Sequence, residues 1–190
     1  MPRIEAPTLA EHHALRRAAI LDAAVAVLGS EGPGALTPAA VAAAAGLARS
    51  SVYQYFSSTA ELVAAGVEET FRRAISGIET ALATAATPRE KILAFVSGAL
   101  DAAASGHEPM SVYAAADLPE ECRAAVADLH RRATRPLVEP LEELGVPEPW
   151  ATAELIGGLV STAALQVARG EPLDAARARV QRFVLNALSL

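Results

Sequence analysis

The sequence predicts an all-α fold of about nine helices, in which a three-helix N-terminal head precedes a larger helical bundle. Of the 190 residues, 52% are hydrophobic. Alanine dominates that fraction, and it is the strongest helix former because its side chain loses no entropy. The alternating runs of Val, Ile and Thr that are typical of strands are absent from the sequence. Capping residues, glycines and prolines recur at the spacing expected of helix ends.

The first helix of the head is expected to end near residue 30. Apolar residues recur at helical spacing from Ile20 to Leu28 and form one broad face that can pack in a core. The Gly-Pro-Gly sequence at residues 32–34 cannot continue a helix, so it ends this one.

Two short helices separated by a sharp turn are expected next. Thr37 followed by Pro38 is an N-cap followed by a proline in the first turn, so a second helix starts there. Gly46 can adopt the left-handed backbone conformation that closes this helix. A third helix is expected at residues 49–56. The segment therefore has the spacing of a helix-turn-helix, with small alanines where the two helices cross.

The rest of the chain predicts six more helices joined by short connections. A capping box at residues 58–61 opens the fourth helix, and proline or glycine marks each later junction. Pro136 and Pro140 are expected to kink the seventh helix. We expect the head to comprise residues 1–57 and the bundle residues 58–190. The six helices of the bundle are expected at residues 58–86, 88–105, 110–116, 119–144, 149–169 and 172–189.

The composition argues against several classes of protein. No apolar stretch is seen that approaches the roughly 20 residues needed to span a bilayer, and the N-terminus lacks the apolar core of a signal peptide. A soluble cytoplasmic protein without a membrane partner is therefore expected. The single cysteine, Cys122, allows no intramolecular disulfide. The net charge is −6, but residues 1–60 hold four basic and four acidic residues. If one end of the chain meets a polyanion, it is this neutral N-terminal end.

Polar side chains gather where the second helix of the motif would enter the major groove of DNA. Ser50 and Ser51 can bind phosphates or base edges, and the hydroxyls of two tyrosines can bind phosphate while their rings brace the helix. Gln54 can pair with adenine, and Arg49 can reach guanine or a phosphate. A helical hairpin with aromatic packing and no DNA would use many of the same residues. The expected DNA-binding residues are Thr37, Arg49, Ser50, Ser51, Tyr53, Gln54 and Tyr55, with Gly46 in the turn.

The order of residues across the head resembles the N-terminal domain of TetR-family regulators. The resemblance covers about residues 16–63 and rests on residues 17–24, Gly32, Thr37, residues 41–42, 45–47, 52–58 and 61–62. It implies a ligand-responsive transcriptional regulator, usually a repressor, that binds a palindromic operator in double-stranded DNA as a homodimer. No cofactor and no enzymatic activity are implied.

Two residues depart from the family's pattern. Ala48 stands where the family commonly has a serine or threonine that caps the recognition helix. Thr59 stands where the family commonly has a lysine that contacts phosphate. Because the head is also neutral, we expect its DNA affinity to fall less steeply with salt than that of a typical basic DNA-binding protein.

By the same resemblance, the bundle would bind a small-molecule effector and dimerise through its last two long helices. The scarcity of charge inside these helices favours an apolar or weakly polar effector. The pocket candidates are Phe71, Phe95, Tyr113, His130, Trp150 and Gln166. Small residues at four-residue spacing allow another helix to approach closely, with packing inside the same bundle as the alternative. These dimer-interface candidates are Ala153, Gly157, Gly158, Ser161 and Thr162.

An all-α enzyme and a helical protein–protein adaptor are the alternative classes. The four histidines are scattered, and none has the spacing of a helical metal pair. The acids at residues 120–121 would raise the pKa of the Cys122 thiol and make it a poor nucleophile. No catalytic or metal-binding residue is therefore expected. An adaptor would differ from a regulator in binding another protein and no DNA.

Overall fold

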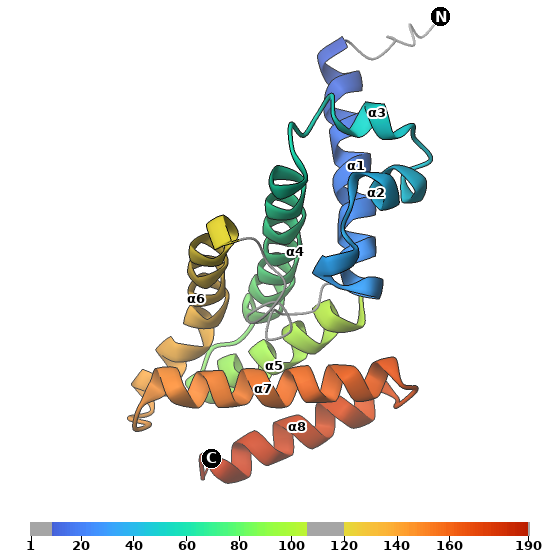
Figure 1. Cartoon of the computed structure of the whole chain (residues 1–190). Helices are drawn as coiled ribbons and strands as arrows, with labels where there is room; N and C mark the ends of the chain where they lie inside the picture. The colour runs from blue at the N-terminus through green and yellow to red at the C-terminus, as the bar shows by residue number, and fades with distance from the viewer. Residues whose placement is uncertain (1–8, 106–119, 190) are drawn as a thin grey trace, which may run out of the picture. The chain divides into compact units, whose positions relative to one another are not determined.

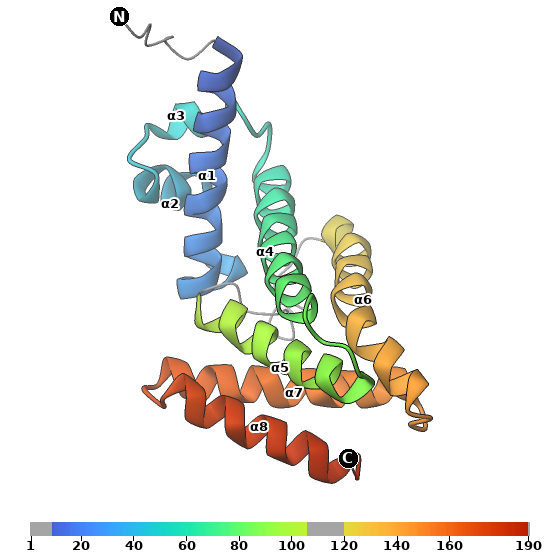
Figure 2. The same ribbon diagram turned by 180° about the vertical axis from the view of Figure 1, so that it is seen from behind.

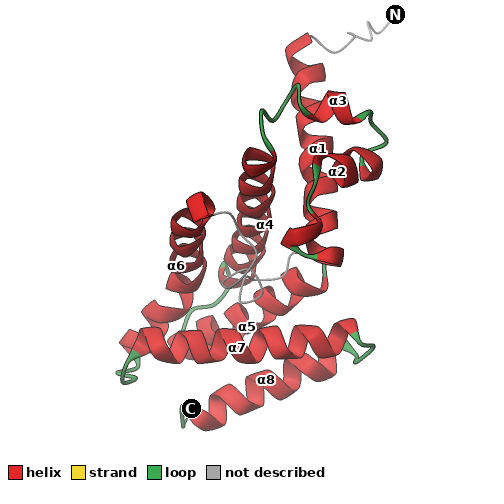
Figure 3. Ribbon diagram, in the orientation of Figure 1, coloured by secondary structure: helices red, strands yellow, loops and turns green. Residues whose placement is uncertain are grey.

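The computed structural model describes residues 9–105 and 120–189, and in these ranges every regular element is helical (Figures 1 and 3). The all-α fold class is thereby confirmed. The helix expected at residues 110–116 lies outside the described residues. The elements are α1 (Leu9–Glu31), a 3₁₀ turn η1 (Pro33–Ala35), α2 (Pro38–Ala44), α3 (Arg49–Val52), α4 (Thr59–Leu82), α5 (Pro88–Ala104), α6 (Glu120–Glu143), α7 (Pro149–Ala168) and α8 (Leu173–Ala187).

The chain divides into two compact units, residues 1–67 and residues 68–190. The division falls inside α4, whose first turns belong to the N-terminal unit and whose later turns belong to the C-terminal unit. The division of roles expected between residues 57 and 58 stays a prediction.

The core of the N-terminal unit forms on the apolar face of α1. Ile20 and Ala24 are fully buried there, and apolar residues of the following elements are buried with them. The backbone of α4 comes close to α1, because a Cβ added at Gly66 would lie 3.3 Å from the Cβ of Ala24. The other buried side chains of this unit include Leu28, Leu36, Val41, Val52, Phe56 and Leu62.

The turn between α2 and α3 is a Schellman motif built on Gly46. Its φ of +66° lies in the left-handed region that favours glycine. The Gly46 N–H donates to the carbonyl oxygen of Ala43 at 3.2 Å, and the Leu47 N–H donates to that of Ala42 at 2.8 Å. These two bonds satisfy carbonyls at the end of α2, so the expected turn is confirmed.

The third helix is shorter than the sequence predicts. Regular α-helix ends at Val52, and the chain reaches Phe56 through tight turns, in which the Gln54 N–H donates to Ser51 and the Phe56 N–H to Val52. The physical reason is tertiary, because the chain turns after Val52 so that Phe56, which is 1% exposed, reaches the core. At the start of the helix, Ala48 occupies the N-cap position and makes no side-chain hydrogen bond.

The C-terminal unit is built around α5. This helix packs against α6, α7 and α8, and α7 also packs against α6 and α8. Both views of the ribbon show α7 and α8 side by side (Figures 1 and 2). A Cβ added at Gly98 of α5 would lie 3.0 Å from the Cα of Ile78, so α4 and α5 approach closely at that point. The core of this unit includes Ile92, Val96, Leu100, Leu137, Leu141, Ile156, Val160, Ala176, Val180 and Val184.

Helix α7 corrects one expectation from the sequence. Its 20 residues are long and apolar enough to cross a membrane by length and composition, with a mean hydropathy of 1.3. The many alanines, leucines and valines of this helix raise its hydropathy. In the fold it packs against three other helices, and the apolar residues Ile156 and Val160 are buried in the core of the C-terminal unit.

Candidate nucleic-acid interface and ligand cavity

The segment around α3 presents polar side chains to solvent and buries two apolar ones. Val52 and Phe56 are 0% and 1% exposed, so they anchor the segment in the core of the N-terminal unit. The predicted site residues lie on its other side. Arg49, Ser50, Tyr53 and Gln54 are exposed, whereas Ser51 and Tyr55 are half-buried.

Arg49 and Tyr53 form one paired group on this surface. The Nη2 of Arg49 donates to the hydroxyl oxygen of Tyr53 at 3.3 Å, and its Cζ lies 5.7 Å from the centroid of the tyrosine ring. The contact is a cation–π interaction between residues one helical turn apart. It orients a guanidinium that has further N–H donors for a phosphate or a base edge.

Thr37 has a structural role at the start of α2. Its side-chain oxygen accepts a hydrogen bond from the N–H of Ala40 at 3.1 Å, as the sequence predicts for an N-cap. A hydroxyl that accepts from the backbone can also donate its own proton. The exposed position of Thr37 therefore remains compatible with a phosphate contact.

The N-terminal half of α1 supports the end of this segment, and the sequence did not indicate these residues. The rings of His13 and Tyr55 have centroids 4.5 Å apart, and Cζ of Arg17 lies 5.3 Å from the centroid of the Phe56 ring. His13 and Arg17 are four residues apart and so share one face of α1. That spacing is a signal for a shared face, but it does not show that Tyr55 and Phe56 lie opposite it.

The junction with α4 is fixed by Glu61. Its Oε2 accepts hydrogen bonds from the backbone N–H of Ser57 at 2.7 Å and from the Ser57 hydroxyl at 2.6 Å. The pKa of Glu61 is lowered below its ordinary value, chiefly by the hydrogen bond from the Ser57 hydroxyl. The hydrogen bond from the Ser57 backbone and the charge of Arg17 lower this pKa further. The Ser58 hydroxyl oxygen accepts from the N–H of Glu61, which is one half of the capping box expected at residues 58–61. The other half differs from the expectation, because the Glu61 carboxylate accepts from Ser57, one residue before the expected cap.

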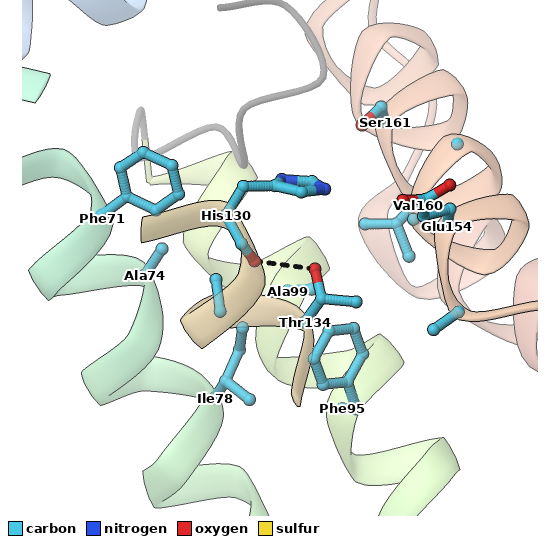
Figure 4. Close-up of a pocket in the computed structure, with 14 residues that line it drawn as sticks. Phe71, Ala74, Ile78, Phe95, Ala99, His130, Thr134, Glu154, Val160 and Ser161 are labelled. Carbon is cyan, nitrogen blue, oxygen red and sulfur yellow. Dashed lines mark hydrogen bonds between the residues drawn. The ribbon is translucent and has the colours of Figure 1, made fainter. Parts of the chain in front are cut away.

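The C-terminal unit contains a cavity of about 280 Å³ between α4, α5, α6 and α7 (Figure 4). Its walls are mostly apolar. They include the buried rings of Phe71 and Phe95, whose side chains point into the cavity from α4 and α5. The polar lining residues are His130, Thr134, Glu154 and Ser161. An apolar hollow with a few polar groups is the usual form of a small-molecule site.

Three of the six pocket candidates line this cavity, namely Phe71, Phe95 and His130. Trp150 and Gln166 do not, because they lie at the two ends of α7. Trp150 is in the first turn and 41% exposed, and Gln166 is in the last turn, where its Oε1 accepts a hydrogen bond from Arg179 at 2.6 Å. Tyr113 lies outside the described residues.

Most of the dimer-interface candidates also line the cavity. Ala153 and Ser161 are buried inside the C-terminal unit, and Gly157 and Gly158 border the same hollow. Thr162 is exposed and donates a hydrogen bond to the carbonyl oxygen of Gly158. Ala153, Gly157 and Ser161 are therefore on the side of α7 that faces α4, α5 and α6. Gly158 borders the hollow but is exposed, as is Thr162, and the exposed Leu155 and Leu165 lie on the same helix.

The chain matches the family described as "Bacterial regulatory proteins, tetR family" over residues 20–65. Among curated proteins it is 29% identical over 134 residues to the HTH-type transcriptional regulator BetI of Rhizobium meliloti (strain 1021). That alignment spans 68% of this chain and 66% of the regulator, which is just under two thirds of the relative's length.

Solved structures share the fold. A TetR-like transcriptional regulator from Rhodococcus sp. RHA1 superposes with a TM-score of 0.76 at 23% identity, covering 100% of this chain and 98% of that one. The regulator FadR from Bacillus subtilis, solved in complex with stearoyl-CoA, has a TM-score of 0.69 at 17% identity and covers 88% and 96% of the two chains. At these identities the likeness extends to the fold.

Proposed function

We propose that this chain, which belongs to the TetR family of bacterial transcriptional regulators, binds a palindromic operator as a cytoplasmic homodimer and is released by a small molecule. The observation that carries the proposal is the solvent-facing polar surface of residues 49–55, held on the buried Val52 and Phe56. A short helix presented in this way after a tight turn is the part of a helix-turn-helix that enters the major groove.

Each exposed side chain of this surface suits one kind of contact. Gln54 can make a bidentate pair with adenine, and the oriented guanidinium of Arg49 can bind guanine or a phosphate. Tyr53 and Ser50 present hydroxyls that suit phosphate oxygens. Since one such surface reads only a few base pairs, a second copy related by a twofold axis supplies the specificity of an operator.

The exposed faces of α7 and α8 suit that dimer. Leu155 and Leu165 on α7 are 73% and 44% exposed, and Phe183 on α8 is 58% exposed. Ala151, Leu155, Gly158, Thr162 and Leu165 recur at helical spacing along one side of α7, and all five are exposed in the single chain. A second copy of this chain, packed on the same face by twofold symmetry, would cover them.

Helix α4 provides the connection between the proposed effector site and the head. It is one continuous helix that carries Leu62, buried in the N-terminal unit, and Phe71, Ala74 and Ile78, which line the cavity. A ligand that fits the cavity better in one position of α4 would shift the population toward that state and change the separation of the two DNA-reading surfaces. We expect the ligand to favour the state that does not bind the operator, so that ligand binding relieves repression.

The cavity indicates the size of the effector. FadR of Bacillus subtilis was solved with stearoyl-CoA, whereas the cavity here, at about 280 Å³, is slightly smaller than the range of about 300–1,000 Å³ that is typical of small-molecule sites. Its walls are mostly apolar, so we expect a compact, apolar or weakly polar molecule.

A gel-shift assay with DNA from upstream of the gene and its neighbours tests DNA binding. We expect the wild-type protein to shift one such fragment. The double variant Tyr53→Ala/Gln54→Ala should lose at least about tenfold in affinity, because both side chains are exposed on the proposed reading surface. The matched control is Ser30→Ala. Ser30 lies near the C-terminal end of α1, and its exposed hydroxyl donates to the carbonyl oxygen of Ala26 in the same helix. If the double variant binds like wild type while both remain helical, the reading surface is assigned wrongly.

Analytical ultracentrifugation tests the dimer. Leu155→Glu places a charge in the centre of the exposed face of α7 and should convert the dimer to monomer. Leu15→Glu is the control, since Leu15 is 63% exposed on α1 in the other unit. A Leu155→Glu protein that stays dimeric would contradict the proposed interface.

A further inference from the structure

We propose that the cavity selects a compact single-ring molecule that carries a hydroxyl or amino group and rejects carboxylates, and that Gly157 sets the size it accepts. This inference rests on the proposed function, because it specifies the effector class of the same regulatory site. Three features carry it: the two aromatic walls, the open space at Gly157, and the charge of the polar groups at the edge.

The aromatic walls and the volume favour a ring. Phe71 and Phe95 are 1% and 7% exposed and bring their side chains into the cavity from two different helices. The rest of the lining includes short side chains, among them Ala99, Ala133 and Ala153. Cavities of roughly 150 Å³ lined by apolar side chains already bind benzene. The 280 Å³ here therefore accommodates one ring with a short substituent.

Gly157 keeps the cavity open on the α7 side. A Cβ added there would meet no heavy atom within 4 Å, in contrast to Gly98, where it would lie 3.0 Å from the Cα of Ile78. Gly157 has no positive φ that would require glycine. A glycine inside a helix is less stable than alanine. Neither close packing nor backbone conformation explains this glycine, whereas the hollow that it borders does.

The polar edge includes an acceptor for a hydrogen-bond donor on the ligand. The ring of His130 extends from α6 toward α7, where Glu154 lines the opposite wall (Figure 4). The Thr134 hydroxyl donates a hydrogen bond to the carbonyl oxygen of His130 at 2.9 Å, so its proton is not available to a ligand.

The charge of the edge disfavours an anionic ligand. The described lining residues include one carboxylate, Glu154, and no lysine or arginine. A carboxylate accepts hydrogen bonds from hydroxyl or amino groups and repels a second carboxylate.

Three probes with the same ring separate these chemistries, namely benzyl alcohol, benzylamine and benzoate. Their affinities for the full chain are measured by ligand-observed NMR titration. We expect benzyl alcohol and benzylamine to bind a few-fold more tightly than benzoate, because Glu154 is exposed and solvent screens its charge. Glu154→Gln should largely remove that difference. Glu142→Gln, an exposed acid of α6 that does not line the cavity, should keep it. Equal or tighter binding of benzoate by the wild type, or binding of none of the probes, overturns the ligand class.

The size claim is tested with Gly157→Leu, whose side chain would occupy the hollow. We expect it to weaken the binding of benzyl alcohol by about tenfold or more. Gly77→Leu is the control, since Gly77 is an exposed helical glycine of α4 outside this cavity. Should the leucine variant fail to fold, Gly157→Ala gives the same test with a smaller expected loss. Probe binding unchanged by a folded substitution at Gly157 overturns the size claim. The proposed function fails separately, when the wild-type protein shifts no DNA.

Discussion

Substitution of Gly98 by alanine should destabilise the C-terminal unit even though alanine is the better helix former. The added Cβ would lie 3.0 Å from the Cβ of Ala81, 3.0 Å from the Cα of Ile78 and 3.2 Å from the carbonyl oxygen of Gly77. Two of these three atoms belong to the backbone, so they cannot move aside by a rotamer change. Overpacking costs about 1–3 kcal/mol, and the upper part of that range, about 2–3 kcal/mol, applies where the obstructing atoms belong to the backbone. About 1 kcal/mol of helix propensity is recovered. We expect a net loss of about 1–2 kcal/mol.

Thermal unfolding followed by circular dichroism measures this effect. A loss of about 1–2 kcal/mol corresponds to a fall in Tm of roughly 2–8 °C for a protein of this size. Gly77→Ala is the matched control on the facing helix, because a Cβ there would meet nothing within 4 Å. That variant should gain about 0.5–1 kcal/mol. If Gly98→Ala proves as stable as Gly77→Ala, the close approach of α4 and α5 is not real and the reasoning fails.

Three further predictions follow from single side chains. The pKa of Glu69 is lowered to about 2, chiefly because Arg72 donates hydrogen bonds to its carboxylate. Since the folded pKa lies below the ordinary value of 4.5, Glu69 stabilises the fold above that pH and loses its effect as the pH falls toward 2. Glu69→Gln should therefore lower the free energy of unfolding at pH 7 and flatten its acid dependence in urea titrations. Thr59→Lys should steepen the slope of log affinity for DNA against log salt by about 0.9 per copy, and an unchanged slope would place residue 59 away from phosphate. Ala48→Ser supplies the missing N-cap side chain of α3 and should increase the free energy of unfolding of the head by about 1 kcal/mol, measured as a rise in its Tm.

The head was predictable because its determinants are local in the sequence. The turn at Gly46 and the cap at Thr37 each involve partners within about five residues, and the structure shows both. The length of α3 was less predictable. Whether a helix continues past Val52 depends on how Phe56 reaches the core, and this is a tertiary contact.

The support of the DNA-facing segment could not be derived in the same way. His13 contacts Tyr55, and Arg17 contacts Phe56, across a long stretch of intervening chain. Helical spacing shows that the two α1 residues share a face, but it does not show what lies opposite that face. The sequence therefore indicated the proposed DNA-contacting side chains but did not indicate His13 and Arg17, which pack against that segment.

The cavity shows why convergence is harder to predict than periodicity. Aromatic residues on separate helices were expected to meet, and Phe71 and Phe95 do line one hollow. Trp150 was selected by the same criterion, yet it lies at the first turn of α7, is 41% exposed and does not line the hollow. All three residues are aromatic, and the lengths and crossing points of the helices decide which of them reach the cavity.

The small residues of α7 illustrate the same limit in a sharper form. A four-residue repeat of Ala, Gly and Ser predicts a smooth helix face, and a smooth face can serve either a close helix contact or an open space. Gly98 and Gly157 realise the two outcomes, the first packed at 3.0 Å against backbone and the second with nothing within 4 Å. The sequence around each is helical and apolar, so no local signal distinguishes them. The two glycines differ in whether another helix lies close to the added Cβ position, as α4 does at Gly98. A glycine stripe therefore identifies the face of a helix on which side-chain volume matters, and the fold decides whether that volume is occupied by a second helix or is left for a ligand.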